Sequence, residues 1–384
     1  MFFSAKNICA LFIALVTTLM VYQYAYIPAY ERVPQEEIAK IENQMNDVSF
    51  YIKKYKDMIA QYEENEPQSE NIDDLRMMLK IWEKYDSRKK MMSTLWISPE
   101  DDADSILLFN RQIDEMLVDA PTGMEMGIEL IYDENQRDWQ RRMLLHAAYE
   151  EEGWKEPVID CKPTGGYVLY DALSGKTVIF LVLVILVMFW NYDIWSFDFD
   201  NATYKLLYTL PYSKNRIFAI RCLVHWLGSL IGVLIVLSCL FVKGTSVYGM
   251  GLESFQIVND QALSHFGGFS EKMLFLGNGD FAMKLKDVII LRLGLTMFFL
   301  TVFFCVIQFI SFSIANGTSV IITFTTILLL VCSTSIMGVN LTVENEAVLS
   351  GDMGIGVPLV ILIEICTAIV FLIWTNWWMH HREV

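Results

Sequence analysis

Long runs of apolar residues alternate with polar segments along the chain. A helix of about 20 apolar residues crosses a hydrocarbon core of about 30 Å. The second run, Thr177–Tyr192, is shorter than this. It reaches the required length when it is extended to Gly175–Trp195, with Trp190, Tyr192 and Trp195 as an aromatic belt at the membrane surface. The pattern therefore predicts an all-α polytopic membrane protein with six transmembrane helices: Ile8–Ile27, Thr177–Tyr192, Ile220–Val242, Val288–Phe312, Ser319–Val339 and Val357–Trp378.

The polar segment after the first run has the apolar spacing of helices. From Ile38 to Tyr62 the apolar positions are separated alternately by three and four residues, which is typical of a helix–helix seam. Glu63–Ser69 is a turn by composition, and a second helical pattern follows from Ile72 to Tyr85. We expect an antiparallel hairpin, either a rigid docking arm or simply a packed pair of helices. Further elements are expected as helices at Asp104–Val118 and Asn135–Glu152, a strand at Gly127–Tyr132 and a loop at Pro157–Gly166.

Charge separates this segment from the rest of the chain. The formal net charge is −16, and residues 28–173 hold 32 acidic and 17 basic residues, a net charge of −15. We therefore expect one acidic, mainly helical domain at 28–173, large enough for its own core. Its acidity argues against nucleic acid and anionic lipid as partners and permits cationic ones, although it can also serve solubility alone. The first helix occupies 1–27, and 174–384 holds five more helices, with loops at 193–221 and 243–287.

Basic residues in the short segments predict the orientation. Loop 340–356 has acidic residues and no Lys or Arg, whereas loop 193–221 is basic. Both termini and loop 193–221 are therefore expected in the cytoplasm, with the acidic domain and loop 243–287 outside. Residues 1–27 resemble a signal peptide, but no small-x-small cleavage site follows, so an uncleaved helix is favoured. The basic residues that carry the orientation are Lys6, Lys205, Lys214, Arg216, Arg221 and Arg382.

Loop 193–221 has an ordered pattern of its own. Asp200 or Asn201 can cap a short helix at Ala202–Leu210, which Pro211 would end. Ser213 can then cap the next membrane helix. On these residues alone, two interpretations are open: an ordinary interfacial helix, or an element through which a cytoplasmic partner moves the membrane helices.

No catalytic or cofactor motif accompanies these helices. Ser174–Thr177 resembles the end of a phosphate-binding loop, but Tyr170 stands where that motif needs glycine, so no ATPase is expected in this chain. The histidines and cysteines have no metal-binding or catalytic spacing, and we expect neither a metal nor an enzyme. Glu364, in the last predicted span, is costly in a membrane and is a pathway or gate candidate. Gln308 is a weaker one; a structural role is open for both.

One group of residues in loop 193–221 resembles a known family. Its Leu-Leu, Leu-Pro-x-Ser and basic positions resemble the type-two permeases of ATP-binding-cassette exporters, as does the six-helix layout, over about 240 residues. Ala202 replaces a glycine that is usual there, Lys214 replaces an arginine, and the large acidic domain departs from the compact loop of many members. The residues that carry the resemblance are Asp200, Thr203, Leu206, Leu207, Leu210, Pro211, Ser213 and Arg216.

The resemblance implies that Ala202–Leu210 is a coupling helix seated on a separate cytoplasmic ATPase. Pro211 would set the corner, and Lys214 with Arg216 would lie at the lipid headgroups. ATP and Mg²⁺ would bind the ATPase subunits, and a second permease chain, identical or different, would complete the pathway. The segment Val339–Val357 would form an outer gate. The residues expected to touch the ATPase are Tyr204, Leu207, Tyr208 and Leu210.

These expectations describe a permease subunit in a bacterial plasma membrane. It would move an amphipathic substrate, a peptide or lipid-like molecule, with antimicrobial peptide export or immunity as one candidate process. An alternative from another class is a membrane-anchored sensor or scaffold with an acidic receptor domain outside. A membrane enzyme that uses Glu364 is a third.

Overall fold

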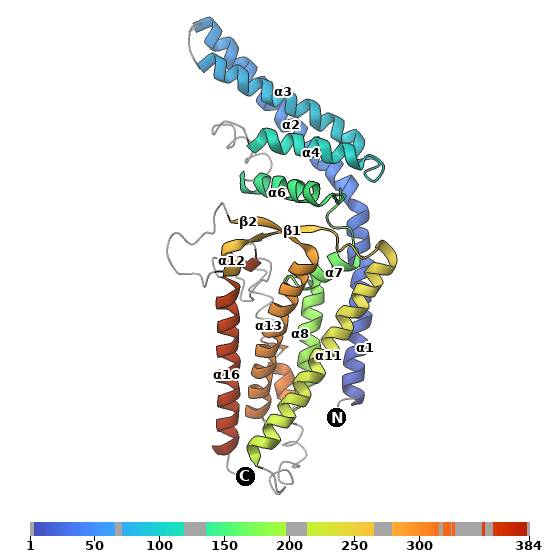
Figure 1. Cartoon of the computed structure of the whole chain (residues 1–384), viewed down its shortest axis with the longest axis vertical. Helices are drawn as coiled ribbons and strands as arrows, with labels where there is room; N and C mark the ends of the chain where they lie inside the picture. Colours follow the sequence, from blue (N-terminus) through green and yellow to red (C-terminus); the bar gives the residue numbers. More distant parts are fainter. Residues whose placement is uncertain are drawn as a thin grey trace. The chain divides into compact units, whose positions relative to one another are not determined.

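The computed structural model describes residues 4–65, 71–118, 136–196, 213–264, 279–314, 318–323, 325–326, 348–349 and 356–381. Within this part the chain is mainly α-helical, as expected (Figure 1). Its contacts divide it into two compact units. We call Ile27–Lys162 with Ser254–Ile257 the acidic unit, and Met1–Tyr26, Pro163–Glu253 and Val258–Val384 the membrane unit.

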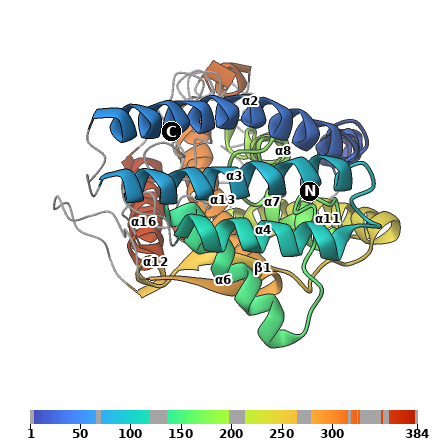
Figure 2. The ribbon, with the colours of Figure 1, turned by 90° about the horizontal axis from the view of Figure 1, so that it is seen from above.

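The acidic unit contains the expected hairpin, formed by α2 (Ile27–Asn65) and α3 (Asn71–Leu95). The two helices run side by side (Figure 2). Lys56 pairs with Glu83 at 2.8 Å, and Glu63, further along α2, pairs with Arg76, earlier on α3, at 2.6 Å. Partners that advance along α2 while they retreat along α3 define an antiparallel pair. The predicted hairpin is therefore confirmed.

Aromatic side chains form much of the core of the acidic unit. Trp82 is buried on α3 and stacks on Tyr51 of α2 with ring centroids 5.3 Å apart. Trp139 of α6 (Gln136–Glu152) is also fully buried in this core, together with Ile106 of α4 (Ala103–Val118). The helices expected at Asp104–Val118 and Asn135–Glu152 are thus confirmed within one residue at each end. The strand expected at Gly127–Tyr132 lies outside the described residues.

The membrane unit holds the long apolar helices α1 (Ala5–Val21), α11 (Lys214–Tyr248), α13 (Leu285–Ser313) and α16 (Val357–His381). A short π-helix, Tyr22–Tyr26, follows α1. Among the described residues, four helices are long and apolar enough to cross a membrane, and the first lies in the helical run Ala5–Asn65. They indicate a multi-pass membrane protein and match the first, third, fourth and sixth predicted spans. The fifth, Ser319–Val339, falls mainly outside the described residues.

The second predicted span is a shorter helix, α8 (Val178–Asn191). Its 14 residues extend about 21 Å at the helical rise, less than a hydrocarbon core. Thr177 Oγ1 accepts a hydrogen bond from Phe180 N at 3.3 Å and starts the helix, and a turn at Tyr192–Trp195 ends it. Because Trp190 and Trp195 are buried, the aromatic belt expected at the membrane surface is wrong for these two residues. They pack inside the protein instead.

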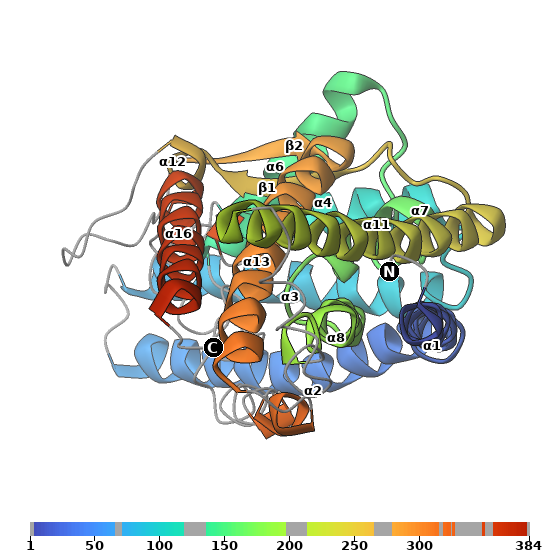
Figure 3. The same cartoon turned by 90° about the horizontal axis from the view of Figure 1, so that it is seen from below.

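The helices of the membrane unit pack around α8, which contacts α1, α11 and α13 (Figure 3). α16 packs on α13. Leu183 and Val187 of α8 and Val233 of α11 are fully buried at these contacts. In contrast, Phe12 of α1 and Val242 of α11 are 67% and 63% exposed, as expected of surfaces that face lipid.

A short helix, α7 (Gly165–Ala172), lies at the opposite end of the membrane unit from the end of α8 and the start of α11. Thr164 caps α7, so the last two residues of the loop expected at Pro157–Gly166 are helical. Segment 243–287 contains the end of α11, the strands β1 (Phe255–Asn259) and β2 (Asp280–Lys284), which form a two-stranded sheet, and α12 (Asp260–Ser264).

Candidate functional site

The two ends of loop 193–221 are described, and together with the end of α8 we call them the loop stem: residues 191–196 at the end of α8 and 213–221 at the start of α11. Ser213 caps α11 as expected, because its Oγ accepts from Arg216 N at 3.4 Å. Lys214 and Arg216 lie in the first turn of α11, with Arg216 exposed. The remaining coupling candidates lie outside the described residues: Asp200, Thr203, Tyr204, Leu206, Leu207, Tyr208, Leu210 and Pro211.

Trp195 is the centre of the loop stem. Its indole is buried and stacks on Phe218 of α11 at 5.7 Å, while Phe312 of α13 meets it edge-on at 5.8 Å. The guanidinium of Arg221 lies 4.9 Å from the indole, within the range of a cation–π contact. The end of α8 is therefore held between α11 and α13 by a cluster of rings.

Hydrogen bonds join the same tryptophan to α13. Trp195 Nε1 donates to Gln308 Oε1 at 2.6 Å, and Ser311 Oγ accepts from Trp195 N at 3.2 Å and from Ser196 N at 3.4 Å. All four side chains are buried, and Gln308 and Ser311 are fully so. A buried polar group that loses its partner costs about 1–3 kcal/mol, so these bonds favour one position of the stem on α13. Gln308, expected as a weak pathway candidate, is seen here to hold the stem.

An ion pair joins the stem to the first helix. Lys6 of α1 pairs with Asp193, and its ammonium lies 4.6 Å from the ring of Tyr192. Both charged side chains are about three-quarters buried, at 27% and 26% exposure. The stem thus contacts α1, α11 and α13 through separate interactions. Sequence reasoning missed this pair because Lys6 and Asp193 are 187 residues apart.

Glu364, the other pathway or gate candidate, lies on α16 and is 8% exposed. Its Oε2 has no hydrogen-bond partner among the described residues. In the same part of the chain, the structure shows no hydrogen bond or ion pair that joins it to Gln308. The two candidates therefore do not form one site in what the structure describes.

The acidic unit has an ionic cluster of Asp114, Arg142, His146 and Glu156, in which Asp114 and His146 are buried, and which the sequence analysis did not single out. Arg142 binds the Asp114 carboxylate through Nε and Nη2, at 2.8 to 3.0 Å. His146 Nδ1 is 2.8 Å from Glu156, and its Nε2 is 3.6 Å from Asp114. This cluster ties α4 to α6 and to the segment after α6.

Burial and charge act in opposite directions on these groups. Burial alone would lower the pKa of His146, but hydrogen bonds and charge from Asp114 and Glu156 outweigh it and raise the pKa to about 9. Burial likewise opposes ionisation of Asp114, yet His146 and Arg142 hold its pKa below the usual value. Nearby, burial and the charge of Glu156 raise the pKa of Asp160 to about 6. His146 is thus an imidazolium at neutral pH.

The phosphate-loop resemblance at Ser174–Thr177 has a local structural explanation. Ser174 Oγ accepts from Lys176 N at 3.3 Å, and Thr177 caps the apolar helix α8. The segment is a helix start with no glycine-rich phosphate cradle. Over the described ranges, no group of three or more His, Cys, Asp or Glu side chains could hold a metal ion.

Comparisons with known proteins add no relative: no family model matches the chain, and no significant similarity to a curated protein or a solved structure was found.

Proposed function

We propose that this chain is the membrane-spanning permease subunit of an ATP-driven exporter of the ATP-binding-cassette class, powered by a separate cytoplasmic ATPase. The observation that carries the proposal is the loop stem. A loop whose sequence resembles a coupling helix begins and ends in residues that contact α1, α11 and α13. A passive surface loop needs no such set of buried attachments.

The attachments suggest how force on the loop reaches the membrane helices. A displacement of the loop would be transmitted to α13 by the Trp195–Gln308 bond and to α1 by the Lys6–Asp193 pair. Closely packed interfaces change between discrete arrangements and do not deform continuously. Nucleotide binding to the partner would then shift the populations of two states of the membrane unit. The size of the shift would depend on how much more tightly nucleotide binds to the assembly in one state than in the other.

The rest of the assembly follows from the same proposal. ATP and Mg²⁺ would bind the ATPase subunits, and a second permease chain would be needed to surround a pathway. The loop and both termini would be cytoplasmic in a bacterial plasma membrane, with the acidic unit outside. The start of α1 contacts the loop stem, which supports a shared side for the N-terminus and the loop. The substrate would be amphipathic, a peptide or lipid-like molecule, and antimicrobial peptides are one candidate.

Co-purification tests the proposal. Leu207→Asp and Tyr208→Asp together should abolish recovery of an ATPase subunit with the tagged chain and abolish ATP-driven transport in vesicles. Met77→Asp, at a half-exposed position of α3, is the matched control and should change neither. Recovery of no nucleotide-binding subunit by the unmodified chain would refute the proposal, as would full activity of the double variant.

A sensor or scaffold is the second candidate, and the ionic cluster of the acidic unit favours it. The charge of an imidazole held between two carboxylates changes with pH, and a response to pH of this kind requires no transport activity. In that case the unmodified chain would bring down no ATPase, and only the acidic unit would mediate its effect.

A further inference from the structure

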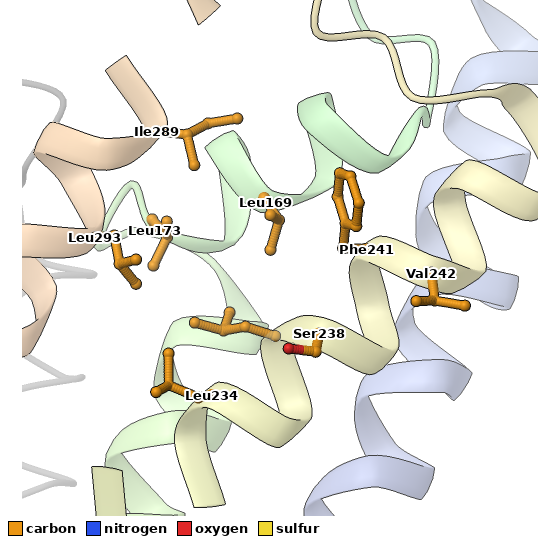
Figure 4. Close-up of a pocket in the computed structure, with 9 residues that line it drawn as sticks. Leu169, Leu173, Leu234, Ser238, Phe241, Val242, Ile289 and Leu293 are labelled. Carbon is orange, nitrogen blue, oxygen red and sulfur yellow. The ribbon is translucent and has the colours of Figure 1, made fainter. Parts of the chain in front are cut away.

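The membrane unit contains an apolar pocket of about 220 Å³ between α7, α11 and α13 (Figure 4). Leu169 of α7 and Leu173, its C-cap, form one wall, Leu234 and Phe241 of α11 a second, and Leu293 of α13 a third. Ser238 of α11 supplies the single hydroxyl in the lining. The pocket lies at the α7 end of the helices, far along α11 and α13 from the loop stem.

The lining selects hydrocarbon over a polar ligand. Transfer of an amide or hydroxyl group to such a site without partners costs about 2–7 kcal/mol. An engineered protein cavity of about 150 Å³ lined by Leu, Ile and Phe stays dry and binds benzene. A pocket of about 220 Å³ with the same kind of lining is therefore suited to several methylene groups.

The pocket wall formed by α11 includes side chains that are exposed on the outer surface of the membrane unit. Val242 is 63% exposed and Leu234 is 43% exposed, and both lie on α11, one of the helices able to cross a membrane. In a bilayer, the medium around such a surface is the acyl chains of lipids. Two residues of the lining, Leu234 and Val242, therefore lie on the helix surface that would face lipid chains.

The opposite wall is fixed in place. Arg292 of α13 is almost fully buried, donates from Nη1 to the Tyr170 carbonyl at 2.8 Å, and lies 3.7 Å from the Tyr170 ring centroid. Gly165 N donates to Gly249 O at 3.0 Å at the start of α7. These contacts attach α7 to α13 and to the end of α11, so the pocket exists before any ligand binds, which lowers the entropic cost of binding.

We propose that this pocket binds one acyl chain of a membrane lipid, which enters beside α11 at Leu234 and Val242. The site does not depend on the permease function, and it gives α7 a role as the inner wall of a lipid site.

Photolabelling of the full chain tests this assignment. The probe is a phosphatidylcholine with a diazirine on one acyl chain, incorporated in phosphatidylcholine vesicles that hold the purified protein. After illumination, mass spectrometry should find adducts on Leu169 of α7 or its C-cap Leu173, which we call the α7 adducts, as well as on the exposed face of α16. A higher ratio of unlabelled to labelled phosphatidylcholine should reduce the α7 adducts, and octane should reduce them too, because the lining recognises hydrocarbon. If octane leaves the α7 adducts unchanged, or if α7 acquires no adduct, the assignment is wrong.

Two substitutions make the result specific. Ser238→Phe should fill the pocket and lower the α7 adducts about tenfold, the change that a loss of about 1.4 kcal/mol of binding gives. Ser246→Phe, on an exposed surface of the same helix, is the matched control and should leave the adducts unchanged. If Ser238→Phe does not fold, Ser238→Leu fills less volume and should give a smaller decrease in the same direction. Unchanged α7 labelling in a folded Ser238 variant would overturn the assignment.

Discussion

At the scale of single residues, Trp195 illustrates what a sequence pattern conceals. Its position after an apolar run favoured the membrane surface, yet it is buried and bonded to Gln308, 113 residues away. Such a bond depends on the packing of α8 on α13, for which local spacing carries no signal. In contrast, the capping role of Ser213 depends on the next three residues alone, and it was predicted correctly.

Trp195→Phe removes the indole N–H donor but keeps an aromatic ring at this position, and it should weaken the stem. Trp195→Phe leaves Gln308 Oε1 without that donor, so the free energy of unfolding should fall by about 1–3 kcal/mol. Under the proposed function, ATPase recovery should persist while ATP-driven transport decreases. Trp226→Phe is the matched control, because Trp226 Nε1 also bonds α13, at Thr301 Oγ1 (3.1 Å), but away from the stem. Equal transport by both variants would contradict the role of Trp195.

His146 makes the acidic unit sensitive to alkaline pH. Its pKa of about 9 in the folded chain exceeds its ordinary value of 6.5, so its contribution is complete below pH 6.5 and is lost as the pH rises through 9. The loss is about 3 kcal/mol at most, at about 1.4 kcal/mol per pKa unit. Asp160 also makes the folded chain less stable as the pH rises, but over a lower range. Burial and the charge of Glu156 raise its pKa to about 6, so its contribution is lost as the pH rises through 6.

Hydrogen exchange of α6 amides, corrected for intrinsic rates, measures this dependence. Protection should decrease from pH 7 to pH 9 in the unmodified chain. His146→Gln should be less protected at pH 7 and should show little change over the same range. A pH dependence that persists in His146→Gln would show that another group is responsible.

At the scale of elements, periodicity predicted the helices of the acidic unit because each buries an apolar stripe against a neighbour. α7 was missed for a related reason. It starts at Thr-Gly-Gly, and glycine has low helix propensity, so composition indicated a loop. The glycines are needed because α7 packs very closely on α11: a Cβ on Gly165 would lie 2.8 Å from the Phe241 carbonyl oxygen. Tertiary packing outweighs propensity there.

This close approach predicts opposite outcomes for two glycine substitutions in helices. Gly165→Ala should destabilise the membrane unit by about 1–3 kcal/mol, since the new methyl group forces α7 away from α11. Gly294→Ala, on α13, meets nothing within 4 Å and should be neutral or stabilising by up to about 1 kcal/mol. Thermal unfolding midpoints of the purified chain in detergent measure both. A Gly165→Ala midpoint equal to that of Gly294→Ala would show that the α7–α11 contact adds nothing.

At the scale of the whole molecule, apolar content established the membrane class but not the number of spans. Among the described residues, four helices have spanning length, and α8 is shorter because a threonine cap and a turn limit it on either side. Hydropathy averages over such caps, whereas hydrogen bonds determine where a helix ends. The residues of the coupling pattern that would touch a partner, Ala202–Leu210, lie outside the described residues. The described residues show how that loop is attached to the membrane helices, through Trp195 and through the Lys6–Asp193 pair.

The Lys6–Asp193 pair tests that attachment over the longest sequence separation in the loop stem. Lys6→Ala and Asp193→Ala should each lower stability, and the double variant should lose less than the sum, with an interaction energy of about 0.5–1 kcal/mol for a partly exposed pair. The charge-swapped variant, Lys6→Asp with Asp193→Lys, should restore part of this energy. If α1 moves with the loop, ATP-driven transport in vesicles should follow the same order: unmodified chain, swapped pair, single variants. Transport that is unaffected in the single variants would mean that the loop drives α11 and α13 without α1, and the permease mechanism would then need only the Trp195 contacts.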